Sequence, residues 1–378
     1  MLFIAKGIAM CCALGVQLLL AKLGGAEGFG SWSLFLNLIL IFSTLSDWGV
    51  NLNGARWVLE ANGETWAYTA YYWRKRISIL SVLLLTVVIF VFYKNQWHYL
   101  VCSIPMVISY GYMSDWYYRG KQNPDKAALR QIIHSVGQLL GVAIIYFLTH
   151  NLWYAFITYS IIASLTYIVT YPGTQNGFNT QNLIPDWLVQ QSSILIGWVC
   201  YFITYNLPIL LLSYFGKANE VGQYSSHYLL YTSFATLSVI TMDIFIAKPQ
   251  YQKQYKTWLF IFTLLAVVGI ACSKWYYPIL FSGKGFAWQS QQTLYMMLLC
   301  VIHAIRLYQI NNLLHHKKGY AFGLWNVISL FIHLIVIAVG IYIIQQYDYL
   351  NAVVYLIIAE ILFLTIYQWG KGLTNKYA

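Results

Sequence analysis

The side chains of this chain that could do chemistry are a few charged residues inside or beside long apolar segments. Arg306 lies within the apolar run MMLLCVIHAIRLYQI, three residues after His303, so both share one face of the expected helix. A cation in such a place is costly unless it is paired or has a task. Two interpretations stay open: Arg306 contacts an anionic ligand, or its side chain extends to the nearest polar boundary.

Further basic candidates stand at the ends of apolar segments. Arg56 and Lys248 occupy corresponding ends of two segments, and Lys6 lies near the start of the first. Taken singly, each is typical of an anchor at a membrane boundary. The shared position of Arg56 and Lys248 favours a common functional role.

Acidic residues are scarce, 11 in the whole chain, so those near apolar segments are also candidates. Asp47 and Asp243 lie near the same two ends as Arg56 and Lys248, and Glu360 lies inside the last segment. These acids either form ion pairs at helix ends or accept a coupling proton or cation. Glu360 is equally compatible with a buried polar role beside a partner elsewhere in the chain.

Two other sets of polar residues are interpreted as structural. A mixed group after the fourth apolar segment is typical of a solvated loop: Asp115, Arg119, Asp125, Lys126 and Arg130. Three isolated histidines are expected to be packed or hydrogen-bonded: His134, His227 and His333.

The composition decides the class of protein. With 60% hydrophobic and 9% charged residues, the chain has too few charges to cover a water-facing surface, so it is an integral membrane protein. The six cysteines lie mostly in apolar runs without the spacing of a zinc site or a disulfide framework, and we expect neither metal nor cofactor. The net charge of +11 lies in short loops, a pattern that orients membrane proteins and does not indicate nucleic-acid binding.

Apolar runs of about 17–25 residues predict about twelve membrane-spanning helices. The expected spans are 2–23, 30–50, 77–93, 100–118, 132–149, 152–171, 188–215, 222–247, 258–275, 289–310, 320–344 and 350–369. The first is expected to be a true span, since no basic segment precedes it as in a cleavable signal. If the amino terminus is cytoplasmic, most of the 22 Lys and Arg residues fall on the cytoplasmic side, which predicts that both termini are cytoplasmic.

A repeat divides the chain into two halves. The stretch Leu23–Leu34 returns as Phe215–Ser226, which places Gly24 on Gly216 and Gly30 on Gly222. Glycine suits such positions because the link between two membrane helices turns sharply and close helix packing leaves no room for a Cβ. The predicted organisation is a first lobe of six helices at 1–172, a polar cytoplasmic linker at 173–187 and a second six-helix lobe at 188–378. An even number of spans before the linker makes the two lobes parallel.

Several short motifs resemble those of bacterial polysaccharide-transport (Wzx-like) flippases of the multidrug/oligosaccharidyl-lipid/polysaccharide exporter superfamily. The motifs are Leu23-Gly24, Gly28-Phe29-Gly30, Trp32-Ser33, Asp47-Trp48-Gly49 with Arg56, Trp116 with Arg119-Gly120 and Arg130, and Val221-Gly222-Gln223-Tyr224-Ser225. The resemblance covers nearly the whole chain. It implies two parallel six-helix lobes around a central cavity in the bacterial inner membrane.

The resemblance also implies a function. Such flippases move an undecaprenyl-pyrophosphate-linked oligosaccharide from the cytoplasmic to the outer leaflet, for O-antigen (lipopolysaccharide), capsule or exopolysaccharide assembly. Arg56, Lys248, Arg306 and Lys6 are then candidate cavity cations for the headgroup. Membrane lipids, H⁺ or Na⁺ as coupling ion, and polysaccharide polymerase and chain-length proteins are the implied partners.

The seventh span departs from the family pattern. Relatives often carry an acidic residue near Asn206-Leu207-Pro208, and this chain has none there, which puts ion coupling at that position in doubt. Because proline removes a backbone hydrogen bond, Asn206 and Pro208 predict a bend in this helix, facing the cavity.

Two other functions are weighed against the flippase. A small-molecule or drug antiporter of the same superfamily needs acidic cavity residues for cationic drugs, whereas basic residues prevail here. A membrane glycan polymerase or acyltransferase is disfavoured because no large loop and no catalytic spacing of His, Asp or Glu is present. The chain is therefore expected not to be an enzyme.

Overall fold

The computed structural model of the chain describes residues 2–59, 63–172, 186–247, 252–315, 319–345 and 347–376. All regular structure in these residues is helical. Seven of the helices are long and apolar enough to cross a membrane, or eight if the bent pair 257–271 and 273–280 is one span. The protein is thus an all-helical, multi-pass membrane protein.

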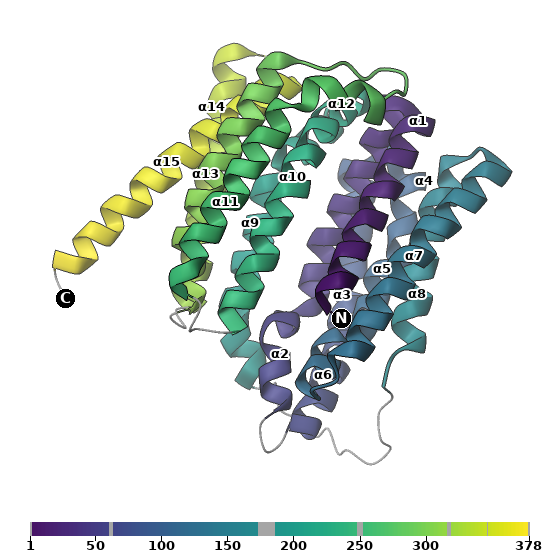
Figure 1. The fold of residues 1–378 in the computed structure, drawn as a ribbon, viewed down its shortest axis with the longest axis vertical. Coiled ribbons are helices and arrows are strands. Elements are labelled where there is room, and N and C mark those ends of the chain that lie inside the picture. Colours follow the sequence, from purple (N-terminus) through teal and green to yellow (C-terminus); the bar gives the residue numbers. More distant parts are fainter. Residues whose placement is uncertain are drawn as a thin grey trace. The chain divides into compact units, whose positions relative to one another are not determined.

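The first helix, α1 (Leu2–Asp47), contains two of the predicted spans. Its backbone leaves the helical region at Gly25, where φ is 62°. In Figure 1 the amino terminus and α2 (Val50–Val58) lie at the same end of the molecule, so α1 runs up and turns back. A residue without Cβ suits this turn, since a positive φ is costly for other residues.

Contacts divide the chain into two compact units. The first comprises 1–24 and 31–195, and the second comprises 25–30 and 196–378. After α1 and α2, the helices of the first unit are α3 (Gly63–Phe92), α4 (Trp97–Leu100), α5 (Ile104–Ser109), α6 (Asp115–Gly120), α7 (Pro124–Thr149) and α8 (Leu152–Val169). Between α3 and α6, short 3₁₀ turns alternate with α4 and α5, so the predicted span 100–118 is a broken run of helical segments.

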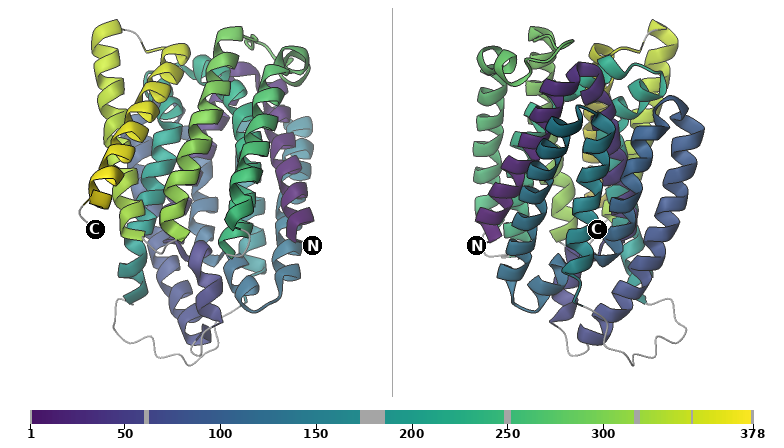
Figure 2. Two further views of the ribbon diagram at one scale, coloured as in Figure 1. Left: turned by 60° about the vertical axis from the view of Figure 1, so that its left-hand side comes forward. Right: turned by 90° about the vertical axis from the view of Figure 1, so that its right-hand side faces the viewer.

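The second unit contains the remaining helices. They are α9 (Asp186–Tyr214), whose first turns belong to the first unit, α10 (Ala218–Ala247), α11 (Gln252–Ala271), α12 (Ser273–Leu280), α13 (Ser290–His315), α14 (Gly319–Ile344) and α15 (Tyr349–Lys376). α11 and α12 meet at 69°. The green to yellow helices α13, α14 and α15 pack against one another, as Figure 2 shows.

Each predicted span overlaps a helix or a run of helical segments, and α1 accounts for two of them. α10 and α13 have 30 and 26 residues, but their described residues are not among the seven segments that are long and apolar enough to cross a membrane. The predicted linker 173–187 lies almost entirely outside the described residues. Two six-helix lobes around a cavity remain a prediction.

Two of the four repeated glycines, Gly30 and Gly222, lie at close backbone contacts within the second unit. A Cβ on Gly30 would overlap the carbonyl oxygen of Ala218, and one on Gly222 would overlap that of Ala26. At the turns themselves the positive φ values fall at Gly25 and at Gly216, where φ is 74°. Gly24 instead packs against the Leu152 side chain, at 3.1 Å from a Cβ built on it.

Candidate functional site

A buried polar cluster lies among α13, α14 and α15 of the second unit. We call it the Arg306 cluster; its members are Arg306, Asn326, Ser329, His333 and Glu360, all at most 1% exposed. Arg306 Nη1 donates to Glu360 Oε1 and, at 2.9 Å, to Ser329 Oγ, while Nη2 donates to Asn326 Oδ1 at 2.8 Å. The guanidinium therefore bonds to one carboxylate and two neutral oxygens.

The helical repeat explains why these groups meet. Asn326, Ser329 and His333 are spaced by three and four residues, so they form one polar stripe on α14. The side-chain amide of Asn326 donates to the Phe322 carbonyl at 2.9 Å, which turns its oxygen toward Arg306. One apolar helix thus presents a polar stripe to the arginine of a second helix and the glutamate of a third.

Aromatic rings enclose the charged centre. The Arg306 guanidinium carbon lies 5.5 Å from the Tyr201 ring centroid, 5.1 Å from that of Tyr205 and 4.7 Å from that of Phe363. Such contacts stabilise a desolvated cation by up to about 2 kcal/mol each. Arg306 therefore does not extend to a polar boundary, and in this conformation its side chain is closed off from an external anion.

His303 connects the cluster to a small pocket. Its Nε2 lies 2.7 Å from the Tyr201 hydroxyl, and its ring stacks on Tyr205 with centroids 4.4 Å apart. The pocket has room for about one water molecule and is lined by Tyr231, Thr263, Ala266, Cys300, His303, Ala304 and Leu307. His303 Nδ1 and the Tyr231 hydroxyl have no hydrogen-bond partner in the structure.

A second buried charge centre lies in the first unit, around Arg74. Arg74 Nη2 donates to Asp47 Oδ1 at 2.9 Å and to the Tyr110 carbonyl at 3.0 Å, and Nη1 donates to the Met113 carbonyl at 2.7 Å. The other oxygen of Asp47 accepts the backbone N–H of Asn51 at 3.1 Å. Arg74 is fully buried and Asp47 is 8% exposed, so this is a buried ion pair joining α1, α3 and the segment before α6.

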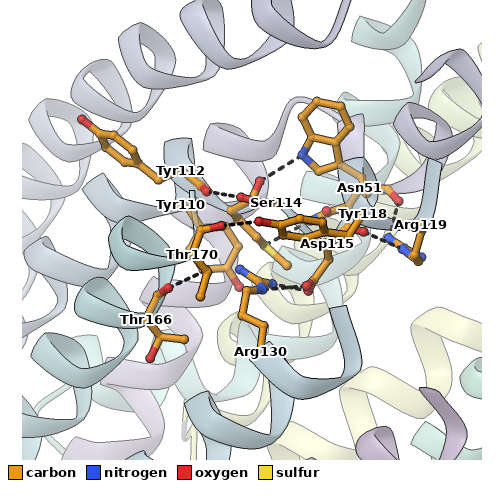
Figure 3. Close-up of polar contacts among 12 residues, drawn as sticks. Asn51, Tyr110, Tyr112, Ser114, Asp115, Tyr118, Arg119, Arg130, Thr166 and Thr170 are labelled. Carbon is orange, nitrogen blue, oxygen red and sulfur yellow. Dashed lines mark hydrogen bonds and ion pairs between the residues drawn. The ribbon is translucent and has the colours of Figure 1, made fainter. Parts of the chain in front are cut away.

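Further polar contacts extend from this centre toward α7 (Figure 3). Asp115 accepts from Arg130 Nε at 2.7 Å and forms an ion pair with Arg130 Nη2. Arg119 Nη2 donates to the Asn51 carbonyl at 3.1 Å. Tyr118 donates its hydroxyl to the Thr170 carbonyl at 2.8 Å, which ties α6 to the end of α8.

One interpretation of the sequence is corrected by these contacts, and two other candidates are placed. Asp47 pairs with Arg74, a cation that was not among the candidates. Arg130 is 4% exposed and bonded to Asp115, so these two residues do not belong to a solvated loop. His333, expected to be packed or hydrogen-bonded, is fully buried, and its Nδ1 lies 2.8 Å from the Ser329 carbonyl.

The other candidates are placed as follows. Lys6 is half-buried on α1, whereas Lys248 lies outside the described residues. Arg56 and Asp243 lie in α2 and α10, but their side chains are outside the described part of the chain.

α9 runs through Pro208 without interruption, and Asn206 donates its side-chain amide to the Phe202 carbonyl at 2.8 Å. Both residues are buried. The predicted bend at Asn206 and Pro208 stays a prediction.

Sequence reasoning missed Arg74, Asn326 and Ser329. Arg74 stands in the basic triplet 74–76, which had the appearance of a boundary anchor. For α14 a signal was present, because Asn326, Ser329 and His333 repeat at helical spacing in an otherwise apolar segment.

Solved structures share the fold over nearly the whole chain. An inward-facing multidrug resistance MATE family transporter of the MOP superfamily is 14% identical, with a TM-score of 0.65 over 98% of this chain and 96% of that chain. The Lipid II flippase MurJ, in an inward closed conformation, is 15% identical, with a TM-score of 0.66 over 96% and 86%. A MOP superfamily transporter from Pyrococcus furiosus is 13% identical, with a TM-score of 0.63 over 98% and 93%.

The TM-scores show that the chain shares the fold of the MOP superfamily transporters, and at such low identities the likeness shows the fold alone. A comparison with curated protein sequences found no significant match. The model of a family described as "Polysaccharide biosynthesis protein" matches residues 1–242. The chain therefore belongs to the polysaccharide biosynthesis protein family, and it has the fold of the MOP superfamily transporters.

Proposed function

We propose that this protein is a flippase that moves undecaprenyl-pyrophosphate-linked oligosaccharide repeat units from the cytoplasmic to the outer leaflet of the bacterial inner membrane. The product would serve O-antigen, capsule or exopolysaccharide assembly. The observation that carries the proposal is the combination of a polysaccharide biosynthesis family with a transporter fold. The likeness to a protein described as a Lipid II flippase supports a lipid-linked substrate.

The proposal assigns roles to the basic residues. A pyrophosphate headgroup needs cations if it is to leave water, because an isolated charge in hydrocarbon is costly. Lys6, Arg56 and Lys248 are the proposed headgroup contacts. Arg306 joins them only in a conformation in which it leaves its contacts with Glu360, Ser329 and Asn326 and becomes exposed, since it is buried here.

The membrane potential favours the outward direction. A cell interior that is negative drives anions outward, and the gain is about 2.3 kcal/mol per charge at 100 mV if the full potential is crossed. A pyrophosphate headgroup gains from this potential unless cations travel with it. H⁺ or Na⁺ as coupling ion would add to the driving force.

Export of a small molecule is a second candidate function, favoured by the likeness to MATE transporters. Cationic drugs require an acidic residue free to bind them. Among the side chains that the structure describes, the buried acids are Asp47 and Glu360, and each carries an arginine. This pairing favours the flippase over a cationic-drug exporter.

Deletion of the gene tests the proposal. We expect lipid-linked repeat units to accumulate on the cytoplasmic leaflet and surface polymer to disappear, because synthesis continues while export stops. Accessibility of the units to a membrane-impermeant glycan-modifying enzyme, in intact and in inverted vesicles, measures the leaflet. Single repeat units displayed on the outside of the deletion strain would indicate a polymerase defect and contradict the proposal.

Cysteine labelling tests the proposed orientation with cytoplasmic termini. In a variant without the six native cysteines, single cysteines at Asn95 and Lys217 are expected to react with an impermeant maleimide from outside intact cells. Cysteines at Lys121 and Lys318 are expected to react only after permeabilisation, since basic loops stay cytoplasmic. The reverse pattern would overturn both the orientation and the outward direction.

A further inference from the structure

The surroundings of His333 fix the position of one proton on its ring. His333 Nδ1 lies 2.8 Å from the Ser329 carbonyl oxygen, four residues earlier on α14. A carbonyl oxygen only accepts hydrogen bonds, so Nδ1 must carry the hydrogen. In a neutral ring, Nε2 would then be an acceptor with a lone pair.

That second nitrogen faces a carboxylate. His333 Nε2 lies 3.3 Å from Glu360 Oε1, and both side chains are fully buried. An ionised carboxylate is also only an acceptor. A neutral His333 beside an ionised Glu360 would therefore place two lone pairs against each other without water between them, which is unfavourable in a buried site.

A proton between the two groups removes the conflict. Either His333 carries it as an imidazolium and Glu360 is ionised, or Glu360 carries it and donates to a neutral His333. In both cases Arg306, Glu360 and His333 together hold a net charge of about +1. The count of protons is the same for the two arrangements.

We propose that Glu360 and His333 share a bound proton in this conformation and form a proton-binding site in the second unit. The sequence predicts a packed role for His333 and leaves the role of Glu360 undecided. In the structure the two side chains lie next to each other. The site is enclosed, since neither side chain has any exposed surface. The proton is thus bound away from bulk solvent.

Other titratable groups define the field at this site. Arg306 and His303 on α13, Tyr205 on α9 and Tyr228 on α10 all interact with Glu360. Arg306 bonds to the same Oε1 that faces His333, whereas Oε2 has no hydrogen-bond partner in the structure. The carboxylate thus keeps one acceptor that a rearranged neighbour can occupy.

Loss of the proton has a structural consequence. With Nε2 and Oε1 both unprotonated, repulsion between them favours rotation of His333 or separation of α14 from α15. Proton release and the packing of these two helices are therefore linked, because any group bound in only one conformation shifts the equilibrium between conformations. If the protein is a flippase, as proposed above, this linkage would couple proton movement to flipping.

Spectroscopy of the resting protein tests the site without any assumption about transport. In lipid nanodiscs at neutral pH, ¹⁵N-histidine NMR is expected to show His333 either as an imidazolium or as a neutral ring with hydrogen on Nδ1. In the second case an infrared band of a protonated carboxylic acid is expected, and Glu360→Gln removes it. A neutral His333 without that band, or with hydrogen on Nε2 alone, would overturn the proposal.

Matched variants assign the signals. His333→Gln identifies the His333 resonances, and Glu360→Gln shifts them, so either variant suffices if the other fails to fold. His227→Gln is the control, because His227 is also buried and lies 3.1 Å from a backbone carbonyl, that of Gln223. It is expected to leave the His333 resonances and the carboxylic acid band unchanged.

Transport in proteoliposomes tests the coupling. An imposed proton gradient is expected to change the rate of flipping of a polyprenyl-pyrophosphate oligosaccharide by about fivefold or more. Glu360→Gln and His333→Gln should lose this dependence, and His227→Gln should keep it. Absence of any flipping by the wild type would contradict the proposed function while leaving the spectroscopic result standing; gradient dependence in either variant, or none in a wild type that flips, would overturn the coupling.

Discussion

Replacement of Glu360 with alanine is expected to destabilise the protein by about 3–5 kcal/mol, because it leaves a buried arginine without its counter-charge. Arg306 is 1% exposed and surrounded by Tyr201, Tyr205 and Phe363, so water cannot take the place of the carboxylate. We expect much less protein in the membrane and a lower melting temperature in detergent. Glu27→Ala, which removes an exposed carboxylate, serves as the control and is expected to change neither.

A double variant separates the cost of an unpaired charge from the loss of packing. Arg306→Met together with Glu360→Leu replaces both charges with apolar groups, and such replacements are often neutral or stabilising. We expect the double variant to recover most of the stability lost in Glu360→Ala, and to remain inactive in transport. A double variant as unstable as the single one would show that the ion pair is not what Glu360 supplies.

The sequence singled out the two charged members of the Arg306 cluster that pair, but not the contact between them. Arg306 and Glu360 were each recognisable, because a charge inside an apolar run is rare and functional by default. Their pairing was not, since the two residues are 54 positions apart and the rotation of each helix about its axis depends on packing. The sequence leaves two surroundings open for Arg306, an external anion or the polar boundary. The partner in the structure is Glu360, an acid of the same chain.

The turn after α1 is a feature that the sequence did not predict. Trp48 and Gly49 have φ values of 49° and 74°, so the chain leaves the axis of α1 directly after Asp47. α2 then starts at Val50, and Arg56 is nine residues beyond the acid. Positive φ at a tryptophan has no signal in the sequence, so the direction in which the chain continues after Asp47 could not be predicted.

Replacement of Arg74 with methionine is expected to have an effect of the same size in the first unit. It would leave Asp47 as a buried carboxylate with only the Asn51 N–H as donor, and would remove the donors to the Met113 and Tyr110 carbonyls. Loss of one partner from a buried pair costs about 3–5 kcal/mol, and further buried acceptors left unsatisfied add to this. We expect a large fall in membrane protein level and in melting temperature.

Arg76 provides a matched control two residues further along the same helix. Its side chain is exposed and packs over Tyr72, with 4.1 Å from the guanidinium carbon to the ring centroid, so Arg76→Met removes the same charge without breaking a buried pair. We expect a change of at most about 1 kcal/mol, the usual range for an exposed cation on a ring. Asp47→Leu added to Arg74→Met should restore part of the stability, since no unpaired charge then remains. Equal losses for Arg74→Met and Arg76→Met would show that basic charge at this end of α3, and not the ion pair with Asp47, is what stabilises the first unit.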